Sequence, residues 1–373
     1  MSRFRSQIRV QSEQYQQHRK DMLLLIDQLL ELNARGAAIS ARREAVFRKR
    51  NQLMPRERLA RLLDPAMPWL AIGNLAGYLL DSDDEATSIP GGTCITGIGF
   101  IGGVRCVVVV DDSGIMAGSL TKAGGYRVMR AQQVSLEQKL PFVHLVESAG
   151  GDLVNYRVEG FTEGGRLFGN QALLSKAGIP VISVLHGSAT AGGAYMPGLS
   201  DYVVAVKGRG RAFLAGPPLL KAATGEIASE AELGGATMHA EQSGLVDYLV
   251  DDDSQAMLLT REIISRLDWN GSPQTVRQAD AAPPHYDPEE IAGIIPIDYR
   301  QPYDMRELVA RIVDGSDITE FKPRFGVATV CLHAQLFGET CGILGNNGPI
   351  DPDGAVKAAQ FLQLCDQSGT PVI

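Results

Sequence analysis

Two short glycine-containing segments, each placed just after an apolar run, are the parts of this sequence best suited to chemistry. The segment "ESAGG" (147–151) follows "PFVHLV" directly, and "TAGGA" (190–194) follows "PVISVL" after four residues. Backbone N–H groups at the start of a helix have no partner within the helix and lie at the positive end of its dipole. Such groups bind anions or a developing oxyanion, and glycine lets a ligand approach them closely. We therefore expect the amides of Gly192 and Gly193 to stabilise an oxyanion.

Tight packing of a helix on a sheet is the alternative explanation for these glycines. Two such turns on neighbouring parallel strands would open at the same edge of the sheet, where α/β folds bind ligands, which favours a binding role. The sequence contains neither GxxxxGK[ST] nor HExxH. "GIGFIG" (97–102) fits GxGxxG, but a strand-like run follows it where the fingerprint needs a helix. We interpret it as a glycine-rich turn, with a dinucleotide site as the alternative.

The reaction class follows from the side chains near the second glycine segment. His186 could be a base, but it has no evident Ser or Cys partner, and we expect it to have a packing or polar role. An oxyanion site without a nucleophile, a metal or a clear base suits the enolate of a thioester whose proton is taken by a group brought in. Lys207, Arg209 and Arg211 could meet the phosphates of a coenzyme A thioester, or they could be ordinary surface charges.

The elements that must position these segments are indicated by hydrophobic periodicity. Four apolar, β-branched runs predict strands, and helical segments between them indicate βαβ units with buried parallel strands; the runs cover residues 104–110, 141–146, 180–185 and 202–206. Residues 17–35 predict one amphipathic helix that ends at Gly36. The basic segment after it, up to "MPRERLARLLD" (54–64), is interpreted as a solvated helix face.

An internal repeat organises the rest of the chain. "GGVRCVVVVDDSGIMAGS" begins at Gly102 and "FGETCGILGNNGPIDPDG" begins at Phe337, and each is followed by a helical segment containing "AQ" and then by a proline that leads a strand. The aligned positions are Cys106 with Cys341, Asp111–Asp112 with Asn346–Asn347, and Ile115 with Ile350. The "AQ" pairs that follow are Ala131–Gln132 and Ala359–Gln360, and the prolines are Pro141 and Pro371. The repeat predicts one α/β unit used twice. The second copy stops before its counterpart of the glycine segments.

Composition excludes several classes of function. The chain has 373 residues and a net charge of −8, which gives no general attraction to nucleic acid or to an anionic membrane. No apolar run in the first helix is long enough to span a bilayer, and the first twenty residues lack the apolar core of a secretory signal. The five cysteines form no CxxC pair and no metal-ligand spacing. We expect a cytoplasmic protein, or a mitochondrial matrix protein in a eukaryotic cell, with no metal.

Five motifs together resemble the carboxyltransferase (beta) subunits of biotin-dependent acyl-CoA carboxylases, most closely the methylcrotonyl-CoA and geranyl-CoA carboxylase branch. The resemblance runs from about residue 15 to the end. The motifs are "HGSATAGGAYMPGLSD", "FLAGPPLLKAATGE", "ELGGATMHAEQSGLVDY", "YDMRELVARIVDGSDITEFKP" and "GILGNNGPIDPDGAVKAAQFLQLC". The resemblance implies two α/β domains of the crotonase-like fold (Clp protease/crotonase superfamily). It also implies transfer of a carboxyl group from N1 of carboxybiotin to an acyl-CoA, with the deprotonated biotin nitrogen as the base.

The family's functional residues can be carried over to matching positions. Gly192 and Gly193 would hold the thioester oxyanion. The other implied substrate-binding residues are Ser148, Ala149, Gly150, Gly151, Ala191, Ala194, Gly216, Pro217 and Pro218, together with Lys207, Arg209 and Arg211. Implied partners are the acyl-CoA substrate, an alpha subunit with biotin carboxylase and biotin carrier parts, and further beta subunits in a homo-oligomer. Expected segments are a helical region (1–60), an acyl-CoA domain (61–266), a linker (267–290) and a partial biotin-side domain (291–373).

The sequence departs from the family pattern at its end. Family members continue after "TPVI" into a second oxyanion turn that receives the biotin ureido oxygen, and we expect the second domain to be truncated before it. Two alternative functions stay open: a biotin-dependent decarboxylase subunit, and a catalytically inactive assembly protein. A serine peptidase of the same superfamily is disfavoured, because Ala191 stands where those enzymes carry the serine. The sequence does not identify the acyl group.

Overall fold

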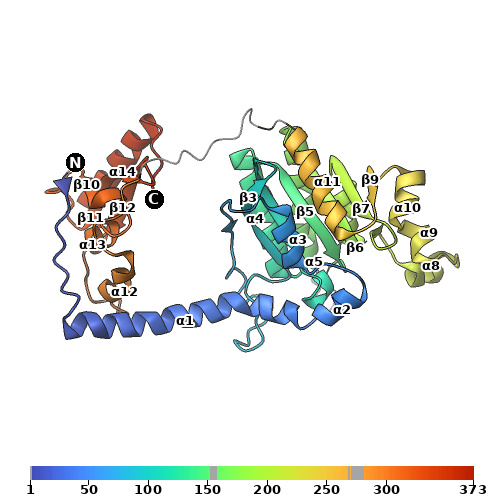
Figure 1. The fold of residues 1–373 in the computed structure, drawn as a ribbon, viewed down its shortest axis with the longest axis horizontal. Coiled ribbons are helices and arrows are strands. Elements are labelled where there is room, and N and C mark those ends of the chain that lie inside the picture. The colour runs from blue at the N-terminus through green and yellow to red at the C-terminus, as the bar shows by residue number, and fades with distance from the viewer. Residues whose placement is uncertain (1, 152–157, 268, 270–280) are drawn as a thin grey trace. The chain divides into compact units, whose positions relative to one another are not determined.

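A computed structural model describes residues 2–151, 158–267, 269 and 281–373 (Figure 1). The chain divides into two compact units. The smaller unit joins Met1–Leu30 to Gln274–Ile373, and the larger unit is Glu31–Pro273. Helix α1 (Glu13–Ala41) contains the boundary between Leu30 and Glu31. The sequence predicts this helix, but it is longer than expected, and Gly36 lies inside it rather than at its end.

The larger unit is built on one twisted sheet with the strand order β2-β3-β4-β5-β6-β7-β9, and β8 pairs with β6. Strands β4 to β7 are mutually parallel, as the four apolar runs predict. The strands are β2 (Leu70–Ala71), β3 (Cys94–Ile101), β4 (Val104–Asp111), β5 (Phe142–Ser148), β6 (Val181–Thr190), β7 (Tyr202–Val206), β8 (Arg211–Phe213) and β9 (Tyr248–Val250).

Helices cover both faces of this sheet, which explains why the central strands are apolar at nearly every position. On one face Val128 of α4 and Leu174 of α6 pack in a cluster with Phe142, and on the other face Leu59 of α3 and Ile264 of α11 pack with Val108. The helices are α2 (Glu44–Lys49), α3 (Pro55–Leu62), α4 (Lys122–Gln138), α5 (Val158–Gly164), α6 (Arg166–Lys176), α7 (Tyr195–Gly198), α8 (Pro217–Thr224), α9 (Glu230–Gly234), α10 (Ala236–Met238) and α11 (Asp253–Arg266), with single turns η1 (Met116–Gly118), η2 (Ala191–Ala194) and η3 (His239–Ser243).

Two expectations for the larger unit are corrected by its packing. "GIGFIG" does not form a turn, because its residues up to Ile101 belong to β3. A Cβ atom at Gly97 or Gly99 would lie 2.4 Å or 2.9 Å from the ring of Trp69, so these glycines make room for an indole on the strand. The basic segment is also not uniformly solvated, since the side chain of Arg58 in α3 is 0% exposed.

The smaller unit has an antiparallel sheet with the order β1-β10-β11-β12. Val309, Val330 and Ile343 contribute to its main apolar cluster. Its elements are β1 (Ser2–Arg3), β10 (Asp317–Glu320), β11 (Thr329–Leu336), β12 (Glu339–Asn346), α12 (Ile291–Ile294), α13 (Met305–Val309), α14 (Pro352–Gln367), η4 (Pro288–Glu290) and η5 (Asp314–Ser316). Of the expected linker 267–290, residues 268 and 270–280 lie outside the described residues.

The predicted repeat is present at the level of individual hydrogen bonds. Hairpins β3–β4 and β11–β12 have the same eight-pair register. Each turns through two residues of positive φ, Gly102–Gly103 and Phe337–Gly338. In each turn both N–H groups donate to one carboxylate, Asp64 in the first copy and Asp314 in the second, over 2.6–3.0 Å. The repeat therefore starts earlier than the sequence motifs indicate, in the segments that precede the hairpins.

The helices that follow the hairpins also correspond, as the sequence predicts. The N-cap side chains of α4 and α14, Thr121 and Asp351, each accept from the glycine N–H three residues on. Six residues after each cap a buried cation donates to the first strand of its hairpin, Arg127 to Cys94 O and Lys357 to Thr329 O. Each helix contains its "AQ" pair, as the sequence predicts, although the two pairs lie at different distances from these caps.

Candidate functional site

The two glycine segments meet at the carboxyl ends of β5 and β6. These strands are parallel neighbours, and Ser148 pairs with Ala189 near their ends. A Cβ atom on Gly193 would lie 3.3 Å from the Ser148 Cβ atom, and one on Gly150 would lie 2.8 Å from the Thr190 carbonyl oxygen. The arrangement agrees with the expectation that both turns open at one edge of the sheet.

The turn η2 (Ala191–Ala194) begins directly after β6. Ala191 has a φ of 51°, which reverses the chain at the strand end. Gly192 and Gly193 follow at the start of this short turn, where backbone N–H groups have no partner earlier in the helix. Both glycines are half-buried, and a Cβ atom on Gly192 would approach only the ring of Phe168, at 3.9 Å. Ser148 thus lies beside Gly193, and the ring of Phe168 lies at a greater distance from Gly192.

Ser148 has a structural role at this site. Its Oγ donates to the Gly118 carbonyl oxygen at 2.7 Å and accepts from the Gly150 N–H at 3.2 Å. Gly150 has a φ of 92°, in the region that favours glycine, and Gly151 bridges to Leu120 beside it. A hydroxyl with both functions engaged is not poised as a nucleophile. The exposed Ala149 is anchored through its N–H to the Ala117 carbonyl oxygen at 3.1 Å.

The segment with Gly216, Pro217 and Pro218 lies next to the same strand end. It follows β8, whose Phe213 pairs with Thr190, the last residue of β6. Gly216 is the N-cap of α8, and a Cβ atom on it would lie 3.7 Å from the Phe213 ring. The tertiary structure thus brings this segment beside the turn 191–194, from which it is more than twenty residues away in sequence.

The three predicted phosphate-binding cations have different surroundings. Lys207 is exposed. Arg209 donates to the carbonyl oxygen of Asn51 and lies 3.4 Å from Asp253 Oδ1. Arg211 forms a 2.7 Å ion pair with Glu230. Lys207 is thus the cation of these three for which the structure records no side-chain contact.

A buried charged network that the sequence did not reveal lies next to Glu147 and His186, a few residues before the two glycine turns. Arg58 of α3 donates through Nη1 to Glu147 Oε2 at 2.6 Å, and its Nε lies 3.6 Å from Asp253 Oδ2. His186 of β6 contacts Asp253 Oδ1 through Nδ1 at 2.8 Å. Gln52 donates to Glu147 Oε1 and to the His186 carbonyl oxygen, both at 3.3 Å. The only sequence signal was that Glu147 and His186 stand at the ends of the apolar strand runs.

The protonation states in this network follow from burial and neighbouring charge. Burial alone would raise the pKa of Glu147, but the charge of Arg58 outweighs burial and holds that pKa below its usual value. Burial also opposes ionisation of Asp253, yet the hydrogen bond from His186 and the charge of Arg58 lower the pKa of Asp253. Burial and the nearby Arg58 lower the pKa of His186. The neutral imidazole, fully buried, therefore donates its Nδ1 proton to Asp253, and its burial agrees with a polar rather than a catalytic role.

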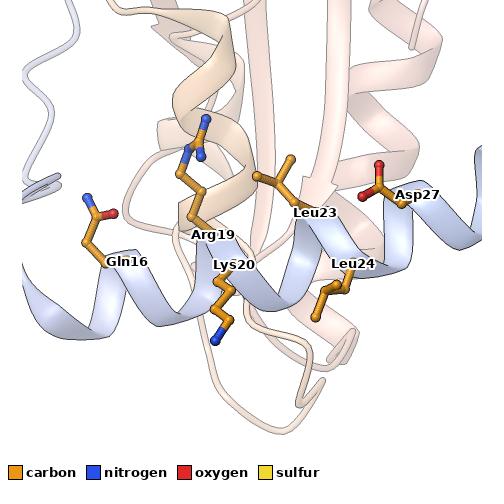
Figure 2. Close-up of a pocket in the computed structure, with 6 residues that line it drawn as sticks. All are labelled: Gln16, Arg19, Lys20, Leu23, Leu24 and Asp27. Carbon is orange, nitrogen blue, oxygen red and sulfur yellow. The ribbon is translucent and has the colours of Figure 1, made fainter.

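Several other features of the described residues carry no chemistry that we can assign. No group of three or more His, Cys, Asp or Glu in them could hold a metal ion. No helix among them is both long and apolar enough to cross a membrane. A shallow hollow of about 330 Å³ is lined by side chains of α1 alone, which do not converge on one point (Figure 2). None of the predicted site residues lines this hollow.

Comparison with known proteins defines the class to which this fold and site belong. Residues 47–373 match the family model of the carboxyl transferase domain. This match covers most of the chain, and the chain belongs to that family.

Two curated relatives are similar over most of this chain. The chain is 43% identical over 325 residues to the probable biotin-dependent acyl-coenzyme A carboxylase beta2 subunit of Mycobacterium tuberculosis, covering 87% of this chain and 60% of that protein. It is 42% identical to the mitochondrial methylcrotonoyl-CoA carboxylase beta chain of Dictyostelium discoideum, covering 87% of this chain and 55% of that one. The chain thus spans less than two thirds of the length of these two relatives.

Solved structures confirm the fold. The beta subunit of geranyl-CoA carboxylase from Pseudomonas aeruginosa matches all of this chain and 69% of its own length, with 47% identity and a TM-score of 0.90. The 12S subunit of transcarboxylase, solved with methylmalonyl-coenzyme A bound, matches 93% of this chain with 28% identity and a TM-score of 0.58. The predicted α/β, crotonase-like fold and the resemblance to the methylcrotonyl-CoA and geranyl-CoA carboxylase branch are therefore confirmed.

Proposed function

We propose that this chain is the acyl-CoA-binding carboxyltransferase part of a biotin-dependent acyl-CoA carboxylase. The single observation that carries the proposal is the turn with Gly192 and Gly193, which begins directly at the end of β6 and has Ser148 beside Gly193. Ser148, the nearest hydroxyl, is engaged by two backbone groups. An oxyanion site without an available nucleophile suits enolate chemistry on a thioester.

In this proposal each of the site residues described above has a defined role. The Gly192 and Gly193 N–H groups stabilise the oxygen of the acyl-CoA thioester as negative charge develops on it. Ser148 and the turn 149–151 hold the opposite wall of the space, and the segment that begins at Gly216 closes a further side. Lys207 offers a charge to the phosphates of coenzyme A. Carboxybiotin, when bound, supplies the carboxyl group and the nitrogen that accepts the proton from the carbon to be carboxylated, which in a β-branched α,β-unsaturated thioester is the γ-carbon conjugated with the carbonyl.

The substrate and the partners follow from the relatives. A methylcrotonyl-CoA-like or geranyl-CoA-like thioester is proposed as the acceptor, because this branch supplies the geranyl-CoA carboxylase match at 47% identity. Biotin is proposed to arrive on a partner alpha subunit, and we assign no residue of this chain to it. Assembly with further beta subunits is proposed because the transcarboxylase 12S structure is described as a hexamer. Cytoplasm, or mitochondrial matrix in a eukaryote, is the proposed location.

A panel of coenzyme A thioesters tests the proposal. Purified chain is mixed with each thioester, with free biotin or the purified alpha subunit, and with bicarbonate and ATP where the alpha subunit is present. We expect saturable binding of a branched unsaturated acyl-CoA, and carboxylated product when the complex is complete. Decarboxylation alone would favour a decarboxylase subunit. Absence of any thioester binding would contradict the proposal and favour an assembly role.

A further inference from the structure

The pairing of β6 with β5 shifts its register just before the turn 191–194 that follows β6. In the pairing of β5 with β6, Val146 lies opposite Leu185, whereas Ser148 lies opposite Ala189. Three residues of β6 (186–188) therefore stand opposite a single residue of β5, Glu147, and this mismatch is a β-bulge. Bulges of this kind bend a strand, change where its next side chains point, and are over-represented beside active sites. The bulge ends only a few residues before Gly192, so its shape sets the direction in which the turn leaves the sheet.

The side chain of Glu147 fills the inside of this bulge. A Cβ atom on Gly187 would lie 2.6 Å from Glu147 Oε1 and 2.7 Å from its Cγ and Cδ atoms. The whole side chain, and not only its flexible end, occupies the place where any other residue at position 187 would project. The glycine at this position is thus required by Glu147, because Gly187 does not have the positive φ that would require glycine for its own sake.

The carboxylate of Glu147 is held on both oxygens. Arg58 Nη1 donates to Oε2 at 2.6 Å, and Gln52 Nε2 donates to Oε1 at 3.3 Å. The same Gln52 amide donates to the carbonyl oxygen of His186, the first residue of the bulge. The Glu147 N–H donates to Asp111 Oδ2 at 3.1 Å, which ties its backbone to β4. The side chain cannot move aside without breaking a buried ion pair.

Glu147 is also joined directly to the wall of the site. Its neighbour Ser148 is the residue against which Gly193 packs, since a Cβ atom on Gly193 would lie 3.3 Å from Ser148 Cβ. One strand therefore sets both the bulge and the wall, with Glu147 on one face of β5 and Ser148 on the other. The distance between the Gly192–Gly193 amides and Ser148 therefore depends both on the bulge and on the position of Ser148.

We propose that Glu147 is a positioning residue: its buried carboxylate, held by Arg58 and Gln52, keeps the bulge of β6 open and thereby orients the Gly192–Gly193 amides toward the thioester oxygen. The role in catalysis rests on the proposed function, whereas the role in the bulge does not. A misplacement of the turn by about 1 Å can lower a rate by about 10²-fold without touching the reacting atoms.

The test combines Gly187→Ala with Glu147→Ala in a double-mutant cycle on the full chain. The first readout is the stretching frequency of the thioester carbonyl of bound 3-methylcrotonyl-CoA, labelled with ¹³C at that carbon. Oxyanion donors polarise this bond and lower its frequency. We expect Gly187→Ala to abolish most of the downward shift while the Kd for free coenzyme A stays unchanged. In the Glu147→Ala background, adding Gly187→Ala should cause no further loss, because the added methyl group then meets no carboxylate.

The second readout needs no ligand and separates the two proposals. Amide hydrogen exchange of the peptide that spans β6 and η2 should become faster in Gly187→Ala and in Glu147→Gln, an isosteric change that keeps the side-chain volume and is used if Glu147→Ala does not fold. If the wild type shows no carbonyl shift but exchange responds in this way, the proposed function fails and the positioning role in the bulge stands. The matched controls are Gly198→Ala, where the structure offers open space, and Glu307→Gln, a buried carboxylate of the smaller unit paired with Arg311.

Three results would overturn the inference. The first is a full carbonyl shift in Gly187→Ala. The second is an equal effect of Gly187→Ala in the presence and absence of the Glu147 carboxylate, because the glycine would then act independently of it. The third is unchanged exchange across β6 and η2 in Glu147→Gln.

Discussion

Replacing Gly193 with valine is the most direct perturbation of the proposed oxyanion site. Gly193 does not have a positive φ, so the backbone accepts a side chain without strain. The first added atom would lie 3.3 Å from Ser148 Cβ and 3.5 Å from Ser148 Oγ, a separation that a shift of a few tenths of an ångström can accommodate. We expect the two further methyl groups of valine to occupy the place that the thioester oxygen takes in the proposed site. The fold should therefore survive while the oxyanion position is filled.

The expected decrease in rate follows from the loss of one oxyanion donor. Removing one oxyanion donor costs on the order of 10²–10³ in rate, or about 2.7–4 kcal/mol of transition-state stabilisation. Steric exclusion of the thioester oxygen adds to this loss, so Gly193→Val should have no measurable acyl-CoA turnover. Gly193→Ala should lie between this variant and the wild type, because its single methyl group only touches the edge of the space.

The assay is steady-state transfer in the complex with the alpha subunit, with thermal unfolding as the check on folding. The matched control is Gly198→Ala in α7, where a Cβ atom meets nothing within 4 Å. Wild-type turnover in Gly193→Val with an unchanged melting temperature would refute the assignment of this turn. Equal loss in the control variant would show that the effect is on folding and not on the oxyanion.

Three further predictions concern charge. Arg58→Met should lower the free energy of unfolding by about 3–5 kcal/mol in urea titrations, because it leaves Glu147 buried without its cation; a loss below about 1 kcal/mol would contradict this. The folded-state pKa values of Glu147 and Asp253 are lowered, so the stability that these two carboxylates contribute is present above the ordinary pKa values of 4.5 and 3.8. This stability should be lost as the pH falls below those values, which denaturation at a series of pH values can show. An unchanged unfolding free energy at low pH would contradict this. Lys207→Ala should weaken binding of coenzyme A in calorimetric titrations. Arg209→Ala removes a contact with Asp253, so it should lower the unfolding free energy more than the affinity for coenzyme A. The reverse pattern would show that Arg209 contacts the phosphates.

Local sequence patterns determined the elements and the repeat. The runs that became β4 to β7 are apolar at almost every position because both faces of the sheet are covered, and this burial is visible in composition alone. The match of Cys106 with Cys341 was correct because both hairpins have the same number of residues between their turns and strand ends. The glycine pair after β6 was recognisable because a strand followed by small residues is a local pattern.

Tertiary structure alone decided the surroundings of the site. Arg58 lies among other basic residues in sequence, and only the packing of α3 against the sheet shows that it is buried beside Glu147. The sequence gives no reason for a glycine at position 187. The pairing of β5 with β6 supplies the reason, because the Glu147 side chain occupies the place where a side chain at position 187 would project. The pairing of charges across separate strands and helices depends on which segments meet in space. A periodic pattern along one segment carries no information about its partner, which is why the sequence predicted a glycine turn after β6 but not the charged network beside it.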